Sequence, residues 1–339
     1  MRQRAESSRG ERLEAIDQYR GFAILLMVLA DYLADVNTVP AWLKHAPDVG
    51  YTVIDLIAPL FIFAIGLTYG LSFRRRLARD GAWATYQSFI TRNLALIGLG
   101  FLLTLGGNLT GIYPSSVNWG LLQAIGAAGL IALPFIRLPA HWRWVAGFGL
   151  LAVYQLLLDR YWLDAVMAAP HNGPWGALSW GAMLLLATAL ADLYHDLAQR
   201  RAYPWASIAM LVSGLALSFL PSPLGVPISK HRASASYVLV SLGLSALTFY
   251  GFHLRLDSLR SRSPGLGLPK VPILSEWGRN PLLLYVLHGV VIGVFALPAA
   301  PWWYVEAPVW LVMVQAVVLV GILSWVGYAL DRRKLYFSL

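Results

Sequence analysis

The residues with the clearest potential for chemistry are an aspartate inside the first apolar stretch and a histidine in the loop that follows it. Asp31 lies about 13 residues into that stretch, which at ~1.5 Å per residue is roughly 20 Å along a helix. A carboxylate at that depth is costly and usually faces a cavity or a partner, although a structural hydrogen bond would also explain it. His45 carries the side chain best suited to proton transfer near neutral pH, although a lone loop histidine more often has no function.

A second polar set lies nearer the C-terminus, where Asn280, Tyr285 and His288 interrupt another apolar stretch. Polar side chains in a membrane helix either line a cavity or pack against other helices, and the spacing does not separate these interpretations. Asp55 stands at the start of the second apolar stretch, where it could act in a site or cap a helix.

Arginines form the third candidate group. The run Arg74-Arg75-Arg76 follows an apolar stretch, so it could anchor a helix at the lipid surface or bind phosphate groups. Asp17 and Arg20 have the spacing of an ordinary ion pair on one helix face. The chain has no cysteine, and no two of its seven histidines have the spacing of metal ligands. We therefore expect no metal site.

A membrane bundle must position these residues, because the chain is 58% hydrophobic and only 13% charged. Soluble domains carry roughly 25% charged residues, so that class is excluded. Stretches of about 20 apolar residues cross a bilayer as helices, since strand amides would stay unpaired in lipid. The ten expected spans are 18–36, 51–73, 88–106, 119–136, 142–158, 175–194, 204–220, 233–251, 280–298 and 308–330. The predicted fold is all-α, a single domain over 1–339, with 1–17 as a cytoplasmic segment and 252–279 as a cytoplasmic linker.

The distribution of positive charge predicts the orientation. If the N-terminus is cytoplasmic, only Lys44, Arg160, Lys230 and Arg232 of the 26 basic residues lie on the outer side, which leaves 22 inside. Basic loop residues concentrate on the cytoplasmic face of membrane proteins. We therefore expect both termini in the cytoplasm, and the net charge of +9 needs no nucleic acid partner to explain it.

Short blocks in one order along the chain resemble the membrane acyltransferases related to heparan-α-glucosaminide N-acetyltransferase. The blocks are Arg12 to Gly21; His45-Ala46-Pro47 with Asp55; Gly120, Gln123 and Gly126; Pro227, Lys230, Ser234, Ser236 and Tyr237; and Gly278, Asn280, Tyr285 and His288. The resemblance implies transfer of acetyl from cytosolic acetyl-CoA to an amino sugar beyond the membrane. The active histidine of that family falls on His45.

On this interpretation His45 is the base or accepts the acetyl group itself, and Asp31 pairs with it, fixing its tautomer and stabilising its imidazolium. Asn280 or Tyr285 would donate to the oxyanion. The residues expected to hold acetyl-CoA, with arginines on its phosphates, are Arg20, Arg74, Arg92, Arg279, Gln123, Ser236 and His288.

The chain departs from the lysosomal members of that family in ways that leave the acceptor open. Asp31 stands where they have Asn, Ala124 stands where they have Arg, and their large lumenal N-terminal domain has no expected counterpart. The acceptor could be an amino sugar or an envelope glycan, acetylated on nitrogen or oxygen. A transporter of sugars or lipids is the alternative function, although no internal repeat supports it. A non-catalytic scaffold is disfavoured, because such a protein would have no use for a carboxylate such as Asp31 inside a span. We expect a multi-pass protein of a bacterial inner membrane, which could form a homodimer.

Overall fold

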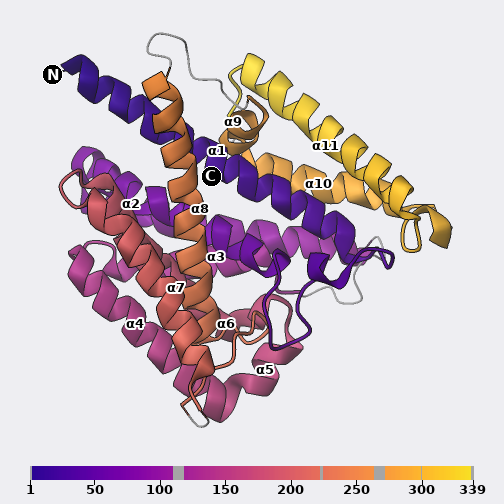
Figure 1. The fold of residues 1–339 in the computed structure, drawn as a ribbon, viewed down its shortest axis with the longest axis horizontal. Coiled ribbons are helices and arrows are strands. Elements are labelled where there is room, and N and C mark those ends of the chain that lie inside the picture. The colour runs from indigo at the N-terminus through magenta and orange to yellow at the C-terminus, as the bar shows by residue number, and fades with distance from the viewer. Residues whose placement is uncertain (1, 110–117, 222–223, 263–271, 299, 337–339) are drawn as a thin grey trace. The chain divides into compact units, whose positions relative to one another are not determined.

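The computed structural model is entirely helical in the part of the chain that it describes, residues 2–109, 118–221, 224–262, 272–298 and 300–336 (Figure 1). The helices are α1 (Arg2–Ala34), α2 (Ile57–Leu109), α3 (Leu121–Ala132), α4 (Ala140–Leu157), α5 (Leu163–Ala168), α6 (Gly173–His195), α7 (Tyr203–Phe219), α8 (Ala235–Arg262), α9 (Pro272–Arg279), α10 (Pro281–Ala296) and α11 (Val309–Arg332). The all-α prediction is confirmed.

Each of the ten predicted spans falls on one or more of these helices. By length and composition, five helical segments among the described residues could cross a membrane, or six if the bent pair α9–α10 counts as one span. The axes of α9 and α10 meet at 97°. Helix α1, whose apolar part holds Asp17, Arg20 and Asp31, is not among the five. The chain is thus an integral membrane protein with several spans, and the number ten stays a prediction.

Helix α2 contains two of the predicted spans, separated by a break at Gly81. Gly81 has φ +78° and ψ 175°, a backbone conformation that residues with a Cβ rarely adopt. The hydroxyl of Thr85 donates to the Gly81 carbonyl at 2.6 Å, which adds a side-chain hydrogen bond at the break. The two halves of α2 therefore run as separate helices on either side of one glycine.

The chain divides into two compact units. Unit 1 comprises residues 1–45, 52–57 and 248–338, and unit 2 comprises residues 46–51, 58–247 and 339. Unit 1 thus holds α1, α9, α10 and α11, and unit 2 holds α3 to α7 with most of α2.

In unit 1, α1 and α9 pack at backbone contact distance, and a glycine on each helix makes this possible. A Cβ on Gly21 would lie 1.8 Å from the carbonyl oxygen of Leu274. A Cβ on Gly278 would lie 1.8 Å from the carbonyl oxygen of Asp17. Because no side chain fits at either place, these glycines determine how closely α9 approaches α1.

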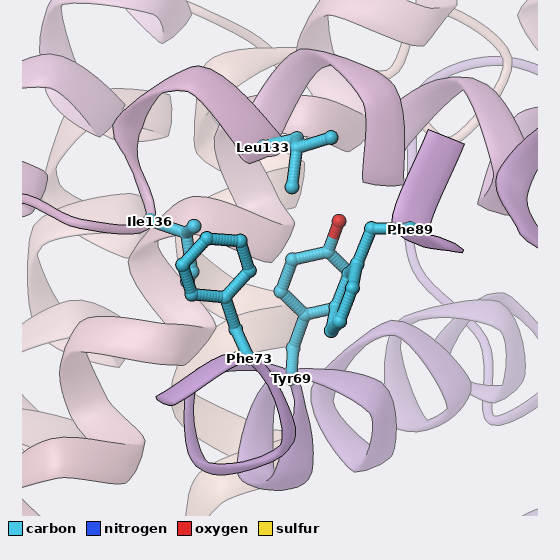
Figure 2. Close-up of a cluster of buried hydrophobic side chains, with 5 residues drawn as sticks. All are labelled: Tyr69, Phe73, Phe89, Leu133 and Ile136. Carbon is cyan, nitrogen blue, oxygen red and sulfur yellow. The ribbon is translucent and has the colours of Figure 1, made fainter. Parts of the chain in front are cut away.

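In unit 2, a cluster of buried side chains joins the two halves of α2 to the segment that follows α3. The cluster consists of Tyr69, Phe73, Phe89, Leu133 and Ile136 (Figure 2). The ring of Phe89 packs edge-on against Tyr69 and Phe73, with centroids 5.0 and 5.3 Å apart. Such edge-to-face pairs add to the stabilisation that burial provides.

The segment expected to be a linker is largely helical where it is described. Helix α8 continues to Arg262, and α9 begins at Pro272. Residues 263–271 lie outside the described residues.

Candidate active site

His45 lies in the loop between α1 and α2, next to a fully buried carboxylate. Its Nδ1 lies 2.8 Å from Oδ1 of Asp55, and both residues belong to unit 1. The second carboxylate oxygen accepts the backbone N–H of Thr52 at 2.9 Å. The Thr52 hydroxyl lies 2.8 Å from the carbonyl oxygen of Lys44, so the loop folds back and brings His45 to Asp55.

This arrangement determines which nitrogen of His45 is basic. The side chain of Asp55 is 0% exposed and that of His45 is 42% exposed. An ionised carboxylate only accepts hydrogen bonds, so beside an ionised Asp55 the hydrogen is on Nδ1, which donates it to the carboxylate. Nε2 of the neutral ring then carries the lone pair. A histidine oriented in this way by a buried aspartate has the geometry of a general base or of a nitrogen nucleophile.

The predicted pairing of Asp31 with His45 is wrong. Asp31 Oδ2 instead lies 2.9 Å from Nε2 of His288 on α10, while His45 is bound to Asp55. Asp31 lies on α1, and α1 packs against α10, which brings together two residues far apart in sequence. Unit 1 therefore contains two separate histidine–aspartate pairs.

The other two predicted catalytic residues lie at different levels of α10. The ring of Tyr285 lies beside that of His288, with centroids 5.2 Å apart. Asn280 stands at the N-cap position, and its side-chain amide donates to the carbonyl of Leu335 at 3.1 Å. Asn280 thus ties the break between α9 and α10 to the C-terminal segment, whereas Tyr285 accompanies the second histidine–aspartate pair.

Arg279, expected to bind a phosphate, is surrounded by carboxylates. It donates to Asp331 at 2.6 Å and lies 3.9 Å from oxygens of both Glu14 and Asp17. Arg20 lies 3.8 Å from Asp17. Burial raises the pKa of Asp17 to about 6, although Arg20 and Arg279 oppose the shift. This cluster joins α1, α9 and α11, and its carboxylates already neutralise Arg279.

The two arginines of unit 2 that were expected to bind phosphate differ in whether a carboxylate already neutralises them. Arg74 donates to both oxygens of Asp192, at 2.8 and 3.3 Å, and Asp192 also accepts a hydrogen bond from the buried Arg143. Arg92 lies on α2 beside Asn93, whose amide donates to the Tyr69 hydroxyl at 3.4 Å. Among the described residues, no carboxylate forms an ion pair with Arg92. Arg92 is therefore the half-buried cation best able to accept an anionic ligand.

Gln123 and Ser236 both hold their own segments of unit 2. The Gln123 side chain accepts the N–H of Gly120 at 3.1 Å and donates to the carbonyl of Asn118 at 3.0 Å, which caps α3. The Ser236 hydroxyl donates to the carbonyl of Pro227 at 3.0 Å. Both side chains thus form hydrogen bonds with backbone atoms of their own unit.

The loop after His45 carries a further ion pair that lies within unit 2. Asp48 accepts from Arg232 Nε at 2.9 Å and from the Ser229 hydroxyl at 2.8 Å. The hydrogen bond from Arg232, together with that from Ser229, lowers the pKa of Asp48. Asp48 was not among the predicted site residues.

Asp55 was a candidate residue in the sequence, but its pairing with His45 was not predicted. The available signal was the spacing Thr52-x-x-Asp55, because a Thr followed three residues later by an acidic residue often begins a helix with reciprocal caps. The structure shows half of that pattern, the Thr52 N–H bound by the Asp55 carboxylate. Such a pattern places the carboxylate at the start of α2, close to the loop that bears His45.

No group of three or more metal-ligating side chains occurs in the described segments of the chain.

The arrangement can be compared with known proteins. Residues 12–255 match the model of a family described as the catalytic part of heparan-alpha-glucosaminide N-acetyltransferase. The human protein of that name is 32% identical over 93 residues, which is 27% of this chain and 14% of the human protein. The mouse protein is 31% identical over 97 residues, which is 28% of this chain and 14% of the mouse protein. Each pairwise match therefore spans about one seventh of the relative's length.

Proposed function

The chain belongs to the family of the heparan-alpha-glucosaminide N-acetyltransferase catalytic part, and we propose that it transfers acetyl from acetyl-CoA to an amine or hydroxyl of a sugar across a membrane. The matched family model covers 244 of the 339 residues. The family is one of membrane acetyltransferases, and several apolar helices of this chain could cross a bilayer. The donor, the acceptor and the roles of individual residues are part of the proposal.

The observation that carries the proposal is the bond from His45 Nδ1 to the buried Asp55. The lone pair on Nε2 takes a proton from the acceptor's N–H or O–H group as the acceptor attacks the acetyl carbonyl carbon. The new C–N or C–O bond forms and the C–S bond breaks, which releases coenzyme A. Asp55 stabilises the imidazolium that forms in this step. Direct attack by Nε2 is the variant mechanism, and it would leave an acetyl-imidazole on His45.

For the nucleotide end of acetyl-CoA we propose Arg92 as the principal cation. Arg279 and Arg74 are already bound by carboxylates, whereas Arg92 has no such partner among the described residues. A phosphate would supply the missing negative charge through charge-assisted hydrogen bonds. Arg20, 3.8 Å from Asp17, is the secondary candidate.

The charge distribution supports a direction for the transfer. Of the 26 basic residues, 22 lie in segments assigned to one side, and His45 lies in a loop assigned to the other. We propose that acetyl-CoA binds from the cytoplasmic, arginine-rich side of a bacterial inner membrane. The acceptor, an amino sugar or envelope glycan, would be acetylated at the outer side.

The test uses purified protein in vesicles of known orientation. Acetyl-CoA labelled in the acetyl group is supplied on the arginine-rich side and glucosamine on the other, and labelled product is measured by mass spectrometry. We expect product with the wild-type protein and none with His45→Ala, which should still bind acetyl-CoA. Unacetylated glucosamine that appears on the arginine-rich side would favour a transporter instead. Unchanged transfer by His45→Ala would refute the role of His45.

A further inference from the structure

The pair formed by Asp31 and His288 differs from the His45–Asp55 pair in its protons. His288 Nε2 lies 2.9 Å from Asp31 Oδ2, and His288 Nδ1 contacts the carbonyl oxygen of Tyr285. The side chain of His288 is 7% exposed, while that of Asp31 is 51% exposed. The imidazole is therefore enclosed, and the pair meets its surroundings through the carboxyl group.

Both ring nitrogens of His288 face oxygen atoms. A carbonyl oxygen only accepts hydrogen bonds, so the tautomer that makes a hydrogen bond to Tyr285 carries its hydrogen on Nδ1. If Asp31 is ionised, Nε2 must carry a second hydrogen, which makes the ring an imidazolium. If Nε2 carries a lone pair, Asp31 must carry the hydrogen instead. In either case one proton lies between Oδ2 and Nε2.

Beside an ionised Asp55, the His45–Asp55 pair holds one proton fewer than the Asp31–His288 pair. There the carboxylate of Asp55 accepts hydrogens from Nδ1 of His45 and from the Thr52 backbone, and the basic nitrogen of the ring is Nε2. The His45–Asp55 pair lacks a proton that it can take up, whereas the Asp31–His288 pair holds one that it can release. Two titratable sites in opposite states are the arrangement that divides acid and base roles within one enzyme.

We infer that Asp31 and His288 form a proton-donating pair that protonates the sulfur of coenzyme A as it leaves. This inference rests on the proposed acetyl transfer. In the step, the C–S bond breaks and its electron pair goes to sulfur. The proton held between Oδ2 and Nε2 passes to that sulfur through the exposed carboxyl of Asp31, and the pair is left with one negative charge. His45 then loses the proton that it took from the acceptor, and Asp31 regains one, by exchange with water, which restores the starting state.

The position of the pair explains why a donor would be useful. Asp31 lies roughly 20 Å along α1, at ~1.5 Å per residue from the start of the predicted span. Ions are poorly solvated at such depth, so expulsion of a bare thiolate is costly. The pair itself is neutral while it holds its proton, because an imidazolium with a carboxylate and an imidazole with a carboxylic acid have the same total charge. It can therefore lie within a span without an uncompensated ion.

The decisive measurement is nitrogen-15 NMR of histidine-labelled full-length protein in nanodiscs at neutral pH, with infrared spectroscopy of the carboxyl groups. His288→Gln identifies the signals of His288. We expect either both His288 nitrogens protonated, or Nδ1 alone protonated together with a carboxylic acid band that Asp31→Asn removes. Nδ1 alone protonated beside an ionised Asp31 would overturn the inference. This reading needs no activity, so it stands apart from the outcome for the proposed function.

The donor role is tested by kinetics on the same variants. Asp31→Asn keeps a hydrogen-bonding group beside His288 but cannot hold the proton. We therefore expect kcat to fall by about 10² to 10⁴ with little change in the KM for acetyl-CoA. His288→Gln should lose a similar factor. Asp35→Asn removes an exposed carboxylate one helical turn away and serves as the matched control. A bound proton in the spectra with unchanged kcat in both variants would refute donation to sulfur.

Discussion

Replacement of Asp55 by asparagine is the sharpest test of the proposed base, because the structure fixes how the new amide must lie. One oxygen of Asp55 accepts the Thr52 N–H at 2.9 Å, and the other lies 2.8 Å from His45 Nδ1. In Asp55→Asn the oxygen must stay on the Thr52 side, since an NH₂ group there would face another donor. The NH₂ group then points at Nδ1, which must present its lone pair. The hydrogen moves to Nε2, and the base is lost.

The expected size of the effect follows from the hydrogen bond and the tautomer together. A hydrogen bond to a charged group is worth about 1.5–3 kcal/mol, which corresponds to roughly tenfold to hundredfold in rate. The reversed tautomer adds to this loss, and the same change in a Ser–His–Asp triad costs about 10⁴ in kcat. We therefore expect kcat to fall by about 10² to 10⁴ in Asp55→Asn.

The assay is single-turnover transfer of labelled acetyl to glucosamine, accompanied by acetyl-CoA binding to show that the protein is folded. Asp48→Asn is the control, since it removes one negative charge three residues from His45 without touching Nδ1. Nitrogen-15 NMR should show hydrogen on Nδ1 of His45 in the wild type and on Nε2 in Asp55→Asn. Transfer by folded Asp55→Asn at a rate close to that of the wild type would refute the orienting role of Asp55.

Three further predictions concern the cofactor, the packing and the pH dependence of stability. Arg92→Gln should weaken acetyl-CoA binding about tenfold or more but leave acetyl-pantetheine binding nearly unchanged. Arg279→Gln should mainly lower thermal stability. An equal loss of affinity for both ligands in Arg92→Gln would contradict a phosphate contact. Gly278→Ala should destabilise the protein strongly, because the new Cβ would lie 1.8 Å from a backbone carbonyl oxygen. Gly289→Ala should not, because no atom lies within 4 Å of its Cβ. Equal melting temperatures of the two variants would contradict the close approach of α9 to α1. The folded pKa of Asp17 is about 6 against an ordinary 3.8, so the folded state binds more protons and the free energy of unfolding falls as pH rises through this range. Asp17→Asn should thus be more stable than the wild type at neutral pH by up to about 3 kcal/mol, with no difference below about pH 4. Denaturation at several pH values measures this, and the absence of a gain in stability at neutral pH would contradict the prediction.

The composition and spacing of the chain predicted the helices well because their cause is local. An apolar stretch of sufficient length must form a helix in lipid, whatever its neighbours are. Predicted span 175–194 corresponds to α6, and 308–330 corresponds to α11, within one or two residues at each end. The break near Gly81 also lies where two predicted spans are separated. The continuation of α8 to Arg262 was not predicted, because a Ser- and Arg-rich sequence carries little local preference for helix over loop.

The partners of the candidate residues could not be predicted in the same way, because they depend on which helices are neighbours. Asp31 and His288 are 257 residues apart, and only the packing of α1 against α10 brings them together. Arg279 looked like a phosphate ligand in the sequence, since arginine is the usual one. Its three carboxylate neighbours lie on α1 and α11, and no spacing within α9 indicates them.

The partner of Asp31 decides what a carboxylate does at this position, in comparison with an asparagine. A carboxylate beside His45 would only have repeated the role that Asp55 already fills. Beside His288, an Asn would donate its amide hydrogen to Nε2 and keep the same contact with a neutral ring, since Nδ1 is occupied by the Tyr285 carbonyl. Aspartate makes that contact possible only with an added proton. Asp31 therefore keeps a contact between α1 and α10 that an asparagine could also make, and it adds one exchangeable proton to unit 1.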